Sequence, residues 1–530
     1  MAEGNENIIL HVENFKLGFS FPEKKEILKG INFDLPRGEI TALLGPSGSG
    51  KSLTALCILG LDRFLQHSWH EGDIIYMEEK EKYNIPQLDE KKLQQIRGKK
   101  IAMLFQDAYS TMDPRIKCGK QILEIICTHT PVDKKKGLEL ALEKIKEVGL
   151  PSRVLEAYPH ELSGGQLQRV ALAIALAAGA KLLIADEPTT NLDSIIKKDI
   201  LDLLKEINKK NNLTVLHISH DYKAVKYVAD NIIYMEEGKI RIQQPAAAFF
   251  SSPFYSKISS IKIHKRNDNN FEKKEIILEV ENLKKYYKKS SLFSFGHKND
   301  GVAALKGISF SLRKNEILAV AGESGSGKST LAKILAGLEE PDEGTITVNG
   351  KKIDRLDKKT GKFLHRHIQI VFQNPQNSLD PLMKTGDLLL EAAKLNKDIT
   401  AAKRKMMHLL ELTGLDKGIL NQYPGDISGG EAQRIALIRA LILNPEILIL
   451  DESLNALDRY LQYDILNVIL KLQQEEQFSI MFITHDITLV KDFCDSILVL
   501  YKGEVVDYGD VNTVFEHPAS QYTKLLVRGF

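Results

Sequence analysis

Two segments of the chain combine glycines, a lysine and a hydroxyl side chain at identical spacing. Both fit the pattern G-x-x-x-x-G-K-[ST], and each follows an apolar run that predicts a buried strand. The glycines let the backbone curl until successive N–H groups point at phosphate oxygens, and the following helix adds the positive end of its dipole. In such loops the lysine reaches the β- and γ-phosphates and the serine hydroxyl holds Mg²⁺. The spacing therefore predicts two nucleotide sites, built from Gly45, Ser47, Gly48, Gly50, Lys51 and Ser52 and from Gly322, Ser324, Gly325, Gly327, Lys328 and Ser329.

Paired carboxylates follow each of these loops at the end of a hydrophobic strand. Asp186 and Glu187 end one run rich in leucine and isoleucine, and Asp451 and Glu452 end another. A carboxylate at the carboxyl end of a buried strand beside a phosphate loop is placed to coordinate Mg²⁺, directly or through water. The next carboxylate points elsewhere and can polarise an attacking water. We therefore expect the aspartates to be metal ligands and the glutamates to be catalytic.

The landmarks recur in the same order, which indicates an internal duplication. The Ser-Gly-Gly segment at 163–165 returns at 428–430, an interval of 428 − 163 = 265 residues, and the carboxylate pairs show the same interval. Each half alternates strand, loop, helix and strand, which predicts an α/β fold with a mostly parallel core sheet. We expect two tandem domains, 1–257 and 275–530, joined by a linker at 258–274.

The first half is longer than the second between its phosphate loop and a later glutamine. The loops are 322 − 45 = 277 residues apart, whereas Gln106 and Gln373 are 373 − 106 = 267 apart. The first half thus has about ten extra residues, which we expect in the polar stretch Glu78–Arg97 as a surface insertion. Farther along each half, 134–148 and 401–412 carry apolar residues at helical spacing, which predicts a helical insert.

The composition restricts the class of protein. There are 72 basic and 70 acidic residues, a net charge of +2, so no strong field for nucleic acid is expected. The longest strongly apolar stretch, Val170–Ala180, is too short for a membrane span, which needs about 20 residues. The start lacks a basic segment followed by an apolar core, so we expect a cytosolic, soluble protein without a secretory signal. No C-x-x-C pair occurs, which favours reduced thiols at Cys57, Cys118, Cys127 and Cys494.

The sequence carries a family resemblance at the duplicated Ser-Gly-Gly segments. Leu-Ser-Gly-Gly-Gln at 162–166 and Ile-Ser-Gly-Gly-Glu at 427–431 each lie between a phosphate loop and an Asp-Glu strand end, and they resemble the signature of the ATP-binding cassette (ABC) ATPases. The resemblance covers nearly the whole chain as two cassettes. It implies two P-loop NTPase domains, each with a mostly parallel core sheet, an antiparallel β subdomain and a helical subdomain.

The resemblance also implies how the site residues work together. In this family two cassettes pack head to tail, so each ATP lies between one phosphate loop and the other cassette's signature. One site would pair Lys51 with Ser428 and Gly430, and the other would pair Lys328 with Ser163 and Gly165. Gly164 and Gly429 belong to the same signatures. The family's remaining positions match Phe19 and Tyr287 for adenine stacking, Gln106 and Gln373 for Mg²⁺ and the transmembrane partner, Asp193 and Asp458 for coupling between sites, and His220 and His485 for the γ-phosphate.

The second half departs from the family pattern at two places. Glu431 replaces the usual glutamine of the signature, and Ser453-Leu454 stand where the first half has Pro188-Thr189. Glu431 adds a carboxylate near the phosphates of the site that contains Lys51. We therefore expect that site to be the slower of the two.

Further segments indicate a branch of the family. Residues 105–114 and 372–381 are similar to the F-Q-(D/N)-P-x-x-S-(L/M)-(N/D)-P motif of the peptide/nickel importer ATPases, and 517–526 resembles the end of that branch. The resemblance implies an ATP- and Mg²⁺-dependent energy-coupling subunit, peripheral at the cytoplasmic face of the inner membrane. Its partners would be two transmembrane permease subunits and, indirectly, an extracytoplasmic solute-binding protein. The solute would be a peptide, nickel or a metal chelate, and 482–494 resembles nickel and chelate importers slightly more than peptide importers.

A soluble tandem ABC ATPase that acts on the ribosome or on DNA is the alternative. Ribosome-acting relatives carry a long charged helical linker between cassettes, whereas the stretch at 258–274 is short and lacks helical periodicity. DNA-repair relatives share the Ser-Gly-Gly-Glu segment but also carry zinc-binding cysteine pairs, which this sequence lacks. No nucleic-acid partner is therefore expected.

Overall fold

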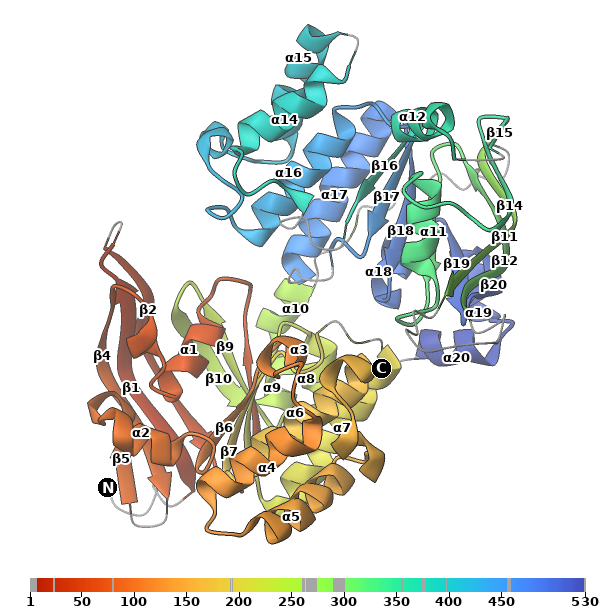
Figure 1. Ribbon diagram of the computed structural model, residues 1–530. Coiled ribbons are helices and arrows are strands. Elements are labelled where there is room, and N and C mark those ends of the chain that lie inside the picture. The colour runs from red at the N-terminus through yellow and green to blue at the C-terminus, as the bar shows by residue number, and fades with distance from the viewer. Residues whose placement is uncertain are drawn as a thin grey trace. The chain divides into compact units, whose positions relative to one another are not determined.

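The computed structural model describes residues 7–21, 24–78, 81–190, 192, 194–259, 263, 274–288, 301–353, 356–372, 378–396, 398–454 and 459–528 (Figure 1). Gln373, Asp193, Asp458 and most of the expected linker lie outside these residues. Contacts divide the chain into two compact units that separate near residue 260.

The first unit contains a six-stranded core sheet in the order β10-β9-β3-β8-β7-β6. All neighbours are parallel except β10, which runs antiparallel to β9. The central strands are uniformly buried and almost wholly apolar, as expected for a parallel sheet that is covered on both faces. The strands are β3 (Ile40–Leu44), β6 (Ile101–Leu104), β7 (Leu182–Asp186), β8 (Thr214–Ile218), β9 (Asn231–Glu236) and β10 (Lys239–Pro245).

A four-stranded antiparallel sheet, β2-β1-β4-β5, completes the β structure of this unit. Its strands are β1 (Ile8–Phe19), β2 (Lys25–Pro36), β4 (Ser68–Glu78) and β5 (Glu81–Asn84). Helix α1 (Lys51–Ile58) packs between the two sheets in one apolar cluster (Figure 1). The phosphate loop is therefore fixed at the end of a helix that has sheet on two sides.

The other face of the core sheet is covered by helices. Among them, α5 (Lys134–Glu147) begins and ends close to the predicted range 134–148. The helices of this layer are α4 (Cys118–His129), α5, α6 (Gly164–Leu176), α7 (Ser194–Asn211) and α8 (Tyr222–Val228), while α2 (Glu90–Ile96), α3 (Ala108–Thr111), α9 (Ala246–Phe250) and α10 (Pro253–Ser259) lie in the connections.

The second unit repeats this architecture. Its core sheet has the order β16-β17-β18-β13-β19-β20, with only β20 antiparallel to its neighbour, and its antiparallel sheet has the order β12-β11-β14-β15. The strands are β11 (Ile276–Lys288), β12 (Gly301–Arg313), β13 (Ile317–Ala321), β14 (Glu343–Val348), β15 (Lys351–Ile353), β16 (Ile368–Val371), β17 (Ile447–Asp451), β18 (Ser479–Thr484), β19 (Ser496–Tyr501) and β20 (Glu504–Asp510).

The helices of the second unit follow the same plan. Helix α11 packs between the two sheets, and a second apolar cluster joins most of the other helices to the opposite face of the core sheet. They are α11 (Lys328–Leu335), α12 (Lys358–His367), α14 (Thr385–Lys394), α15 (Ile399–Leu412), α16 (Gly429–Leu441), α17 (Arg459–Glu476), α18 (Ile487–Phe493), α19 (Val511–Glu516) and α20 (Gln521–Arg528). The two units confirm the predicted α/β class with parallel core sheets, antiparallel sheets and helical layers.

Only about half of the extra residues of the first half lie in the stretch that the sequence predicted. Lys16 of β1 faces Glu71 of β4, and Lys284 of β11 faces Glu343 of β14. The interval at these partners is 343 − 71 = 272, between the 277 of the phosphate loops and the 368 − 101 = 267 of β6 and β16. About five extra residues therefore precede Glu71, of which 68–70 lengthen β4, and only about five fall in Glu78–Arg97. The insertion in Glu78–Arg97 could be predicted because it is polar, whereas the residues that lengthen β4 have no distinctive composition.

One histidine lies inside the core sheet of the first unit. His217 on β8 has no exposed surface, and neither of its ring nitrogens has a hydrogen-bond partner among the described residues. Burial lowers the pKa of His217 to about 4. Its counterpart in the second unit is Phe482, which faces Leu450 where His217 faces Ala185. The equivalent position of the second unit therefore holds a buried phenyl ring.

Replacing His217 with Phe should stabilise the first unit, because two unpartnered polar atoms leave the core. The gain should be about 1–2 kcal/mol at neutral pH. In the unfolded chain this histidine takes up a proton near its ordinary pKa of 6.5, whereas in the folded unit it does so only near 4. Stability should therefore be complete above about pH 6.5 and fall by roughly 3 kcal/mol as the pH drops to 4.

The test is denaturant unfolding followed through Trp69, the single tryptophan, which lies in β4 of the first unit. The His217→Phe variant should lose less stability than the parent between pH 6.5 and 4. Equal pH dependence in the two proteins would show that His217 does not control acid sensitivity.

Two properties of the described residues bear on the expected class of protein. Among them, no helix is both long and apolar enough to cross a bilayer. All four cysteines are free; Cys127 is exposed, whereas Cys57, Cys118 and Cys494 are buried.

Candidate active site

The first phosphate loop connects β3 to α1, and its shape depends on glycine. Gly45 and Gly50 have φ values of 155° and 104°, which residues other than glycine rarely adopt. A Cβ on Gly45 would lie 2.0 Å from the Met235 carbonyl oxygen. Lys51 is only 7% exposed, and its Nζ donates to the carbonyl oxygens of Gly45 and Pro46 at 2.8 and 2.9 Å. The lysine therefore folds back across the loop that a phosphate chain would occupy.

The second phosphate loop has the same geometry. Gly322 and Gly327 have φ values of 156° and 106°, and Lys328 donates to the carbonyl oxygens of Gly322 and Glu323 at 2.8 Å each. Lys328 is 4% exposed. Both loops thus present a glycine-curved backbone and a buried ammonium at the start of a helix, which is an arrangement that binds phosphate.

The aspartates at the ends of β7 and β17 lie next to these loops. Asp186 is buried, and its Oδ1 has no hydrogen-bond partner among the described residues. Burial raises the pKa of Asp186, and the charge of Glu187 adds to that rise, while Ser52 and Lys51 oppose it. In the second unit the Ser329 hydroxyl donates to Asp451 Oδ1 at 3.3 Å. A buried carboxylate oxygen without a protein donor is a position where a cation can bind.

Glu187 lies at the centre of a hydrogen-bonded cluster. Its backbone is left-handed, with φ of 48°, and its N–H donates to the Ile218 carbonyl oxygen at 2.9 Å. Its carboxylate accepts hydrogen bonds from Gln106 Nε2 at 3.1 Å and Thr190 Oγ1 at 2.9 Å, and it lies 2.8 Å from His220 Nδ1. The structure thus brings together three predicted residues, Gln106, Glu187 and His220, from the ends of three neighbouring strands.

The charges in this cluster support one another. Burial would raise the pKa of Glu187, but hydrogen bonds from His220 and Thr190 and the nearby positive charges outweigh it, so the net shift is downward. Burial lowers the pKa of His220, but Glu187 more than compensates and the net shift is upward. At neutral pH the glutamate is therefore ionised and able to accept a proton.

The corresponding carboxylate of the second unit lies near a lysine and a histidine. Glu452 also has a φ of 48°, and its N–H donates to the Ile483 carbonyl oxygen at 3.0 Å. Its carboxylate lies 3.6 Å from Lys328 Nζ and 3.9 Å from His485 Nδ1. Gln373, which would complete this cluster by analogy, lies outside the described residues.

The two predicted aromatic residues lie at the ends of the strands that enter each unit. Phe19 ends β1 and faces Ser68 of β4. Tyr287 lies near the end of β11, where its hydroxyl donates to Glu339 Oε2 at 2.8 Å and lies 3.3 Å from Thr330 Oγ1. Because Thr330 follows the loop residue Ser329, Tyr287 lies beside the second phosphate loop.

Each signature segment begins a helix, and the two copies differ in one hydrogen bond. Ser163 caps α6, and its N–H donates to Gln166 Oε1 at 3.1 Å. Ser428 caps α16, and both its N–H and its hydroxyl donate to Glu431 Oε2, at 2.8 and 2.7 Å. In the second copy the serine hydroxyl is thus already engaged by a carboxylate.

The glycines of these segments serve two purposes. A Cβ on Gly165 would lie 2.6 Å from Ile196 Cγ2, and one on Gly430 would lie 2.6 Å from Leu461 Cδ2, so both allow close packing against the following helix. By contrast, no described residue lies within 4 Å of a Cβ on Gly429, and Leu192 is the one described residue within that distance of a Cβ on Gly164. Among the described residues, the first glycine of each pair is therefore less closely packed than the second.

Two side chains that hold the first site together were not predicted from the sequence. Thr190 donates to Glu187, as described above, and Lys197 Nζ lies 2.8 Å from Asp221 Oδ2, which fixes the segment after His220. Thr190 could have been suggested by its position, three residues after Glu187. Lys197 gave none, because its partner is 24 residues away in the sequence.

Comparisons with known proteins extend over both halves of the chain. A family model described as ABC transporter matches residues 28–190 and 305–455. The "Peptidoglycan transport ATP-binding protein YejF" of Agrobacterium fabrum is 34% identical over 537 residues, which cover 99% of this chain and 97% of that protein. The "Uncharacterized ABC transporter ATP-binding protein YejF" of Escherichia coli K12 is 34% identical over 530 residues, covering 98% and 99%. The "Glutathione import ATP-binding protein GsiA" of the same strain is 32% identical over 561 residues, covering 98% and 89%.

These matches confirm the resemblance that the sequence motifs indicated. The same family model is found twice, and the relatives align along almost the whole chain. All three relatives are named for transport or import, which gives the ribosome and DNA alternative no support, and none of the three names mentions nickel. The chain is therefore an ATPase that belongs to the ABC transporter family and carries two ATP-binding cassettes.

Proposed function

We propose that the protein is the energy-coupling subunit of an importer for peptides or peptide-like solutes. The observation that carries this proposal is full-length similarity to proteins named for glutathione import and peptidoglycan transport. Glutathione is a tripeptide and peptidoglycan carries peptide stems, so both names favour a peptide solute over nickel or a metal chelate. The cassettes would be 1–257 and 275–530, with 258–274 as the linker.

The proposed chemistry uses the residues of both units. Each ATP would contact one phosphate loop and the other unit's signature, so that Lys51 acts with Ser428 and Gly430 and Lys328 acts with Ser163 and Gly165. Gly45, Ser47, Gly48 and Gly50, and Gly322, Ser324, Gly325 and Gly327, would direct backbone N–H groups at the phosphates. The adenine bases would stack on Phe19 and Tyr287.

Hydrolysis would depend on the carboxylates and histidines at the strand ends. Ser52, Gln106 and Asp186 would hold Mg²⁺ in the first site, a role that suits the unpartnered buried oxygen of Asp186. Ser329, Gln373 and Asp451 would do so in the second. When bound, Mg²⁺ offsets the charge that develops on the phosphates. Glu187 and Glu452 would polarise the attacking water, and His220 and His485 would contact the γ-phosphate.

The partners follow from the proposed transport. Two transmembrane permease subunits would receive the closing motion of the cassettes, and an extracytoplasmic solute-binding protein would deliver the solute to them. The ATPase itself would be peripheral, at the cytoplasmic face of the inner membrane.

The proposal is tested by purifying the protein together with the permeases encoded beside its gene and adding the solute-binding protein encoded there. We expect the complex to require detergent and its ATPase rate to rise several-fold with glutathione or other short peptides. Ni²⁺ and metal chelates should leave the rate unchanged, and the protein without permeases provides the basal rate. Recovery with ribosomes or DNA instead of permeases would contradict the proposal.

A further inference from the structure

A cavity of about 1230 Å³ lies in the second unit, away from the phosphate loop. Its walls come from α12, the turn before α15, the first turns of α15, and the segment 443–446. Lining residues His367 and Glu446 immediately precede β16 and β17. The phosphate loop follows the opposite, carboxyl end of the parallel strand β13. The cavity is thus separated from the ATP site by the length of the core strands.

One wall of the cavity is a row of cations on α12. Lys359, Lys362 and Arg366 are spaced by three and four residues, which places them on one face of the helix. All three are exposed. The charge of Lys359 acts on Asp357, the N-cap of α12, whereas within the part of the chain that the structure describes the side chains of Lys362 and Arg366 have no ion-pair or hydrogen-bond partner. A face of this kind has donors to offer to a ligand.

The carboxylates of the cavity are already engaged. Asp398 caps α15 and accepts from the Ala401 N–H at 2.9 Å. Glu446 lies 2.8 Å from His367 Nδ1 and accepts from Asn349 Nδ2 at 2.5 Å. Neither acid is paired with the cations of α12.

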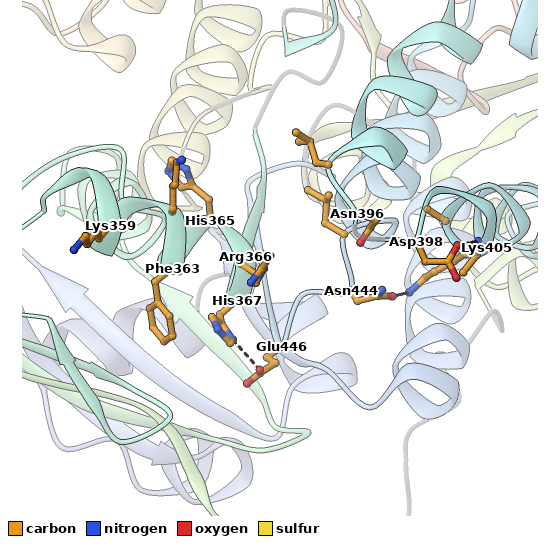
Figure 2. Close-up of a pocket in the computed structure, with 15 residues that line it drawn as sticks. Lys359, Phe363, His365, Arg366, His367, Asn396, Asp398, Lys405, Asn444 and Glu446 are labelled. Carbon is orange, nitrogen blue, oxygen red and sulfur yellow. Dashed lines mark hydrogen bonds and ion pairs between the residues drawn. The ribbon is translucent and has the colours of Figure 1, made fainter.

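The opposite wall adds a further donor. Figure 2 shows Arg366 and His367 on one side of the gap and Asn396, Asn444 and Lys405 on the other. Lys405 donates to Asn444 Oδ1 and to Glu476, so the Asn444 side chain has its amide nitrogen left to donate. The Arg366 guanidinium thus lies across the gap from the Asn444 amide, and the ammonium groups of Lys362 and Lys359 continue the row along α12, with Lys359 at its far end.

We propose that this cavity binds a compact oligophosphate, that is, a small molecule with two or more adjacent phosphate groups. A guanidinium binds a phosphate through two parallel hydrogen bonds, and ammonium groups bind it as point charges. Several cations along one wall of the cavity match a chain of phosphates better than they match a singly charged group. By the 267-residue interval, Gln95 and Lys99 stand where Lys362 and Arg366 lie, so this guanidinium face belongs to the second unit alone.

The test is calorimetric titration of the full chain with tripolyphosphate while both nucleotide sites are saturated with a non-hydrolysable ATP analogue and Mg²⁺. We expect one further binding event per chain. In the double variant Lys362→Gln and Arg366→Gln this event should weaken at least about tenfold, because two charge-assisted contacts are lost. A control that removes two exposed lysines from the first unit, Lys91→Gln and Lys92→Gln, should bind as the parent does.

Several results would overturn the proposal. They are the absence of a further binding event, unchanged binding in the α12 double variant, and equal loss in the control variant. Citrate and a glutamate-rich peptide serve as competing anions in separate titrations. If either bound as tightly as tripolyphosphate, the assignment to phosphate would be wrong.

Discussion

Replacing Glu187 and Glu452 together with Gln should reduce ATP turnover at least about a hundredfold and leave ATP binding intact. The amide has nearly the same shape as the carboxylate but cannot accept a proton from water, and a lost general base typically costs 10²–10⁴ in rate. At Glu187 the surrounding hydrogen bonds keep the pKa below its ordinary value, so the parent carboxylate is ionised at neutral pH. Phosphate release and equilibrium ATP binding measure the two quantities separately.

The control for this variant changes glutamates that lie far from the proposed chemistry. Glu143 on α5 and Glu411 on α15 are exposed, so a Glu143→Gln plus Glu411→Gln variant should turn over ATP as the parent does. Since hydrolysis releases the closed cassettes in the proposed cycle, the catalytic double variant should also retain bound ATP. If the Glu187→Gln plus Glu452→Gln variant hydrolysed ATP at the parent rate, groups other than these two glutamates would be the catalytic bases.

Much of this site could be predicted because its residues are local in sequence. The phosphate loops and the Asp-Glu pairs at strand ends are continuous segments, and the strands beside them are buried on both faces, so their apolar runs are readable. The helical insert was predicted to within a few residues for the same reason, since apolar residues recur at helical spacing along α5 and α15.

The remaining features depend on contacts between distant segments. The length of β4 was missed because its added residues pair with β1 and leave no compositional mark. The contact of Lys197 with Asp221 and the solvent-free position of His217 follow from how strands and helices pack, which spacing does not show. The sequence shows that Glu431 stands where the first signature has Gln166. It does not show that the Ser428 hydroxyl donates to Glu431.

The difference between the two signature segments should have a large effect on the ATP site that contains Lys51. Glu431 accepts both the N–H and the hydroxyl of Ser428, and these hydrogen bonds lower the pKa of Glu431, so it is charged at neutral pH. In the first copy Gln166 is neutral, and among the described contacts of Ser163 its hydroxyl accepts from Gln166 N–H at 3.4 Å and donates to no group. In the proposed arrangement Ser428 completes the site of Lys51. A triphosphate there would meet a carboxylate and a serine whose hydrogen is already used.

Replacing Glu431 with Gln should therefore strengthen ATP binding and speed turnover at the site of Lys51. A unit charge roughly 7 Å from a phosphate is worth about 2 kcal/mol at an effective dielectric constant of 20, and solvent reduces this to about 1–2 kcal/mol. The expected gain is about five- to thirtyfold. The reverse change, Gln166→Glu, should impair the site of Lys328 by a similar factor.

The measurement isolates one site at a time by removing the catalytic glutamate of the other. In a Glu452→Gln background only the site with Lys51 hydrolyses, so adding Glu431→Gln should raise the rate and lower the Kd for ATP. In a Glu187→Gln background only the site with Lys328 hydrolyses, and the same change should have no effect. A gain in the second background alone would mean that each signature acts on its own unit's nucleotide, which contradicts the head-to-tail arrangement. No gain in either background would leave that arrangement standing and show that the charge of Glu431 does not reach the phosphates.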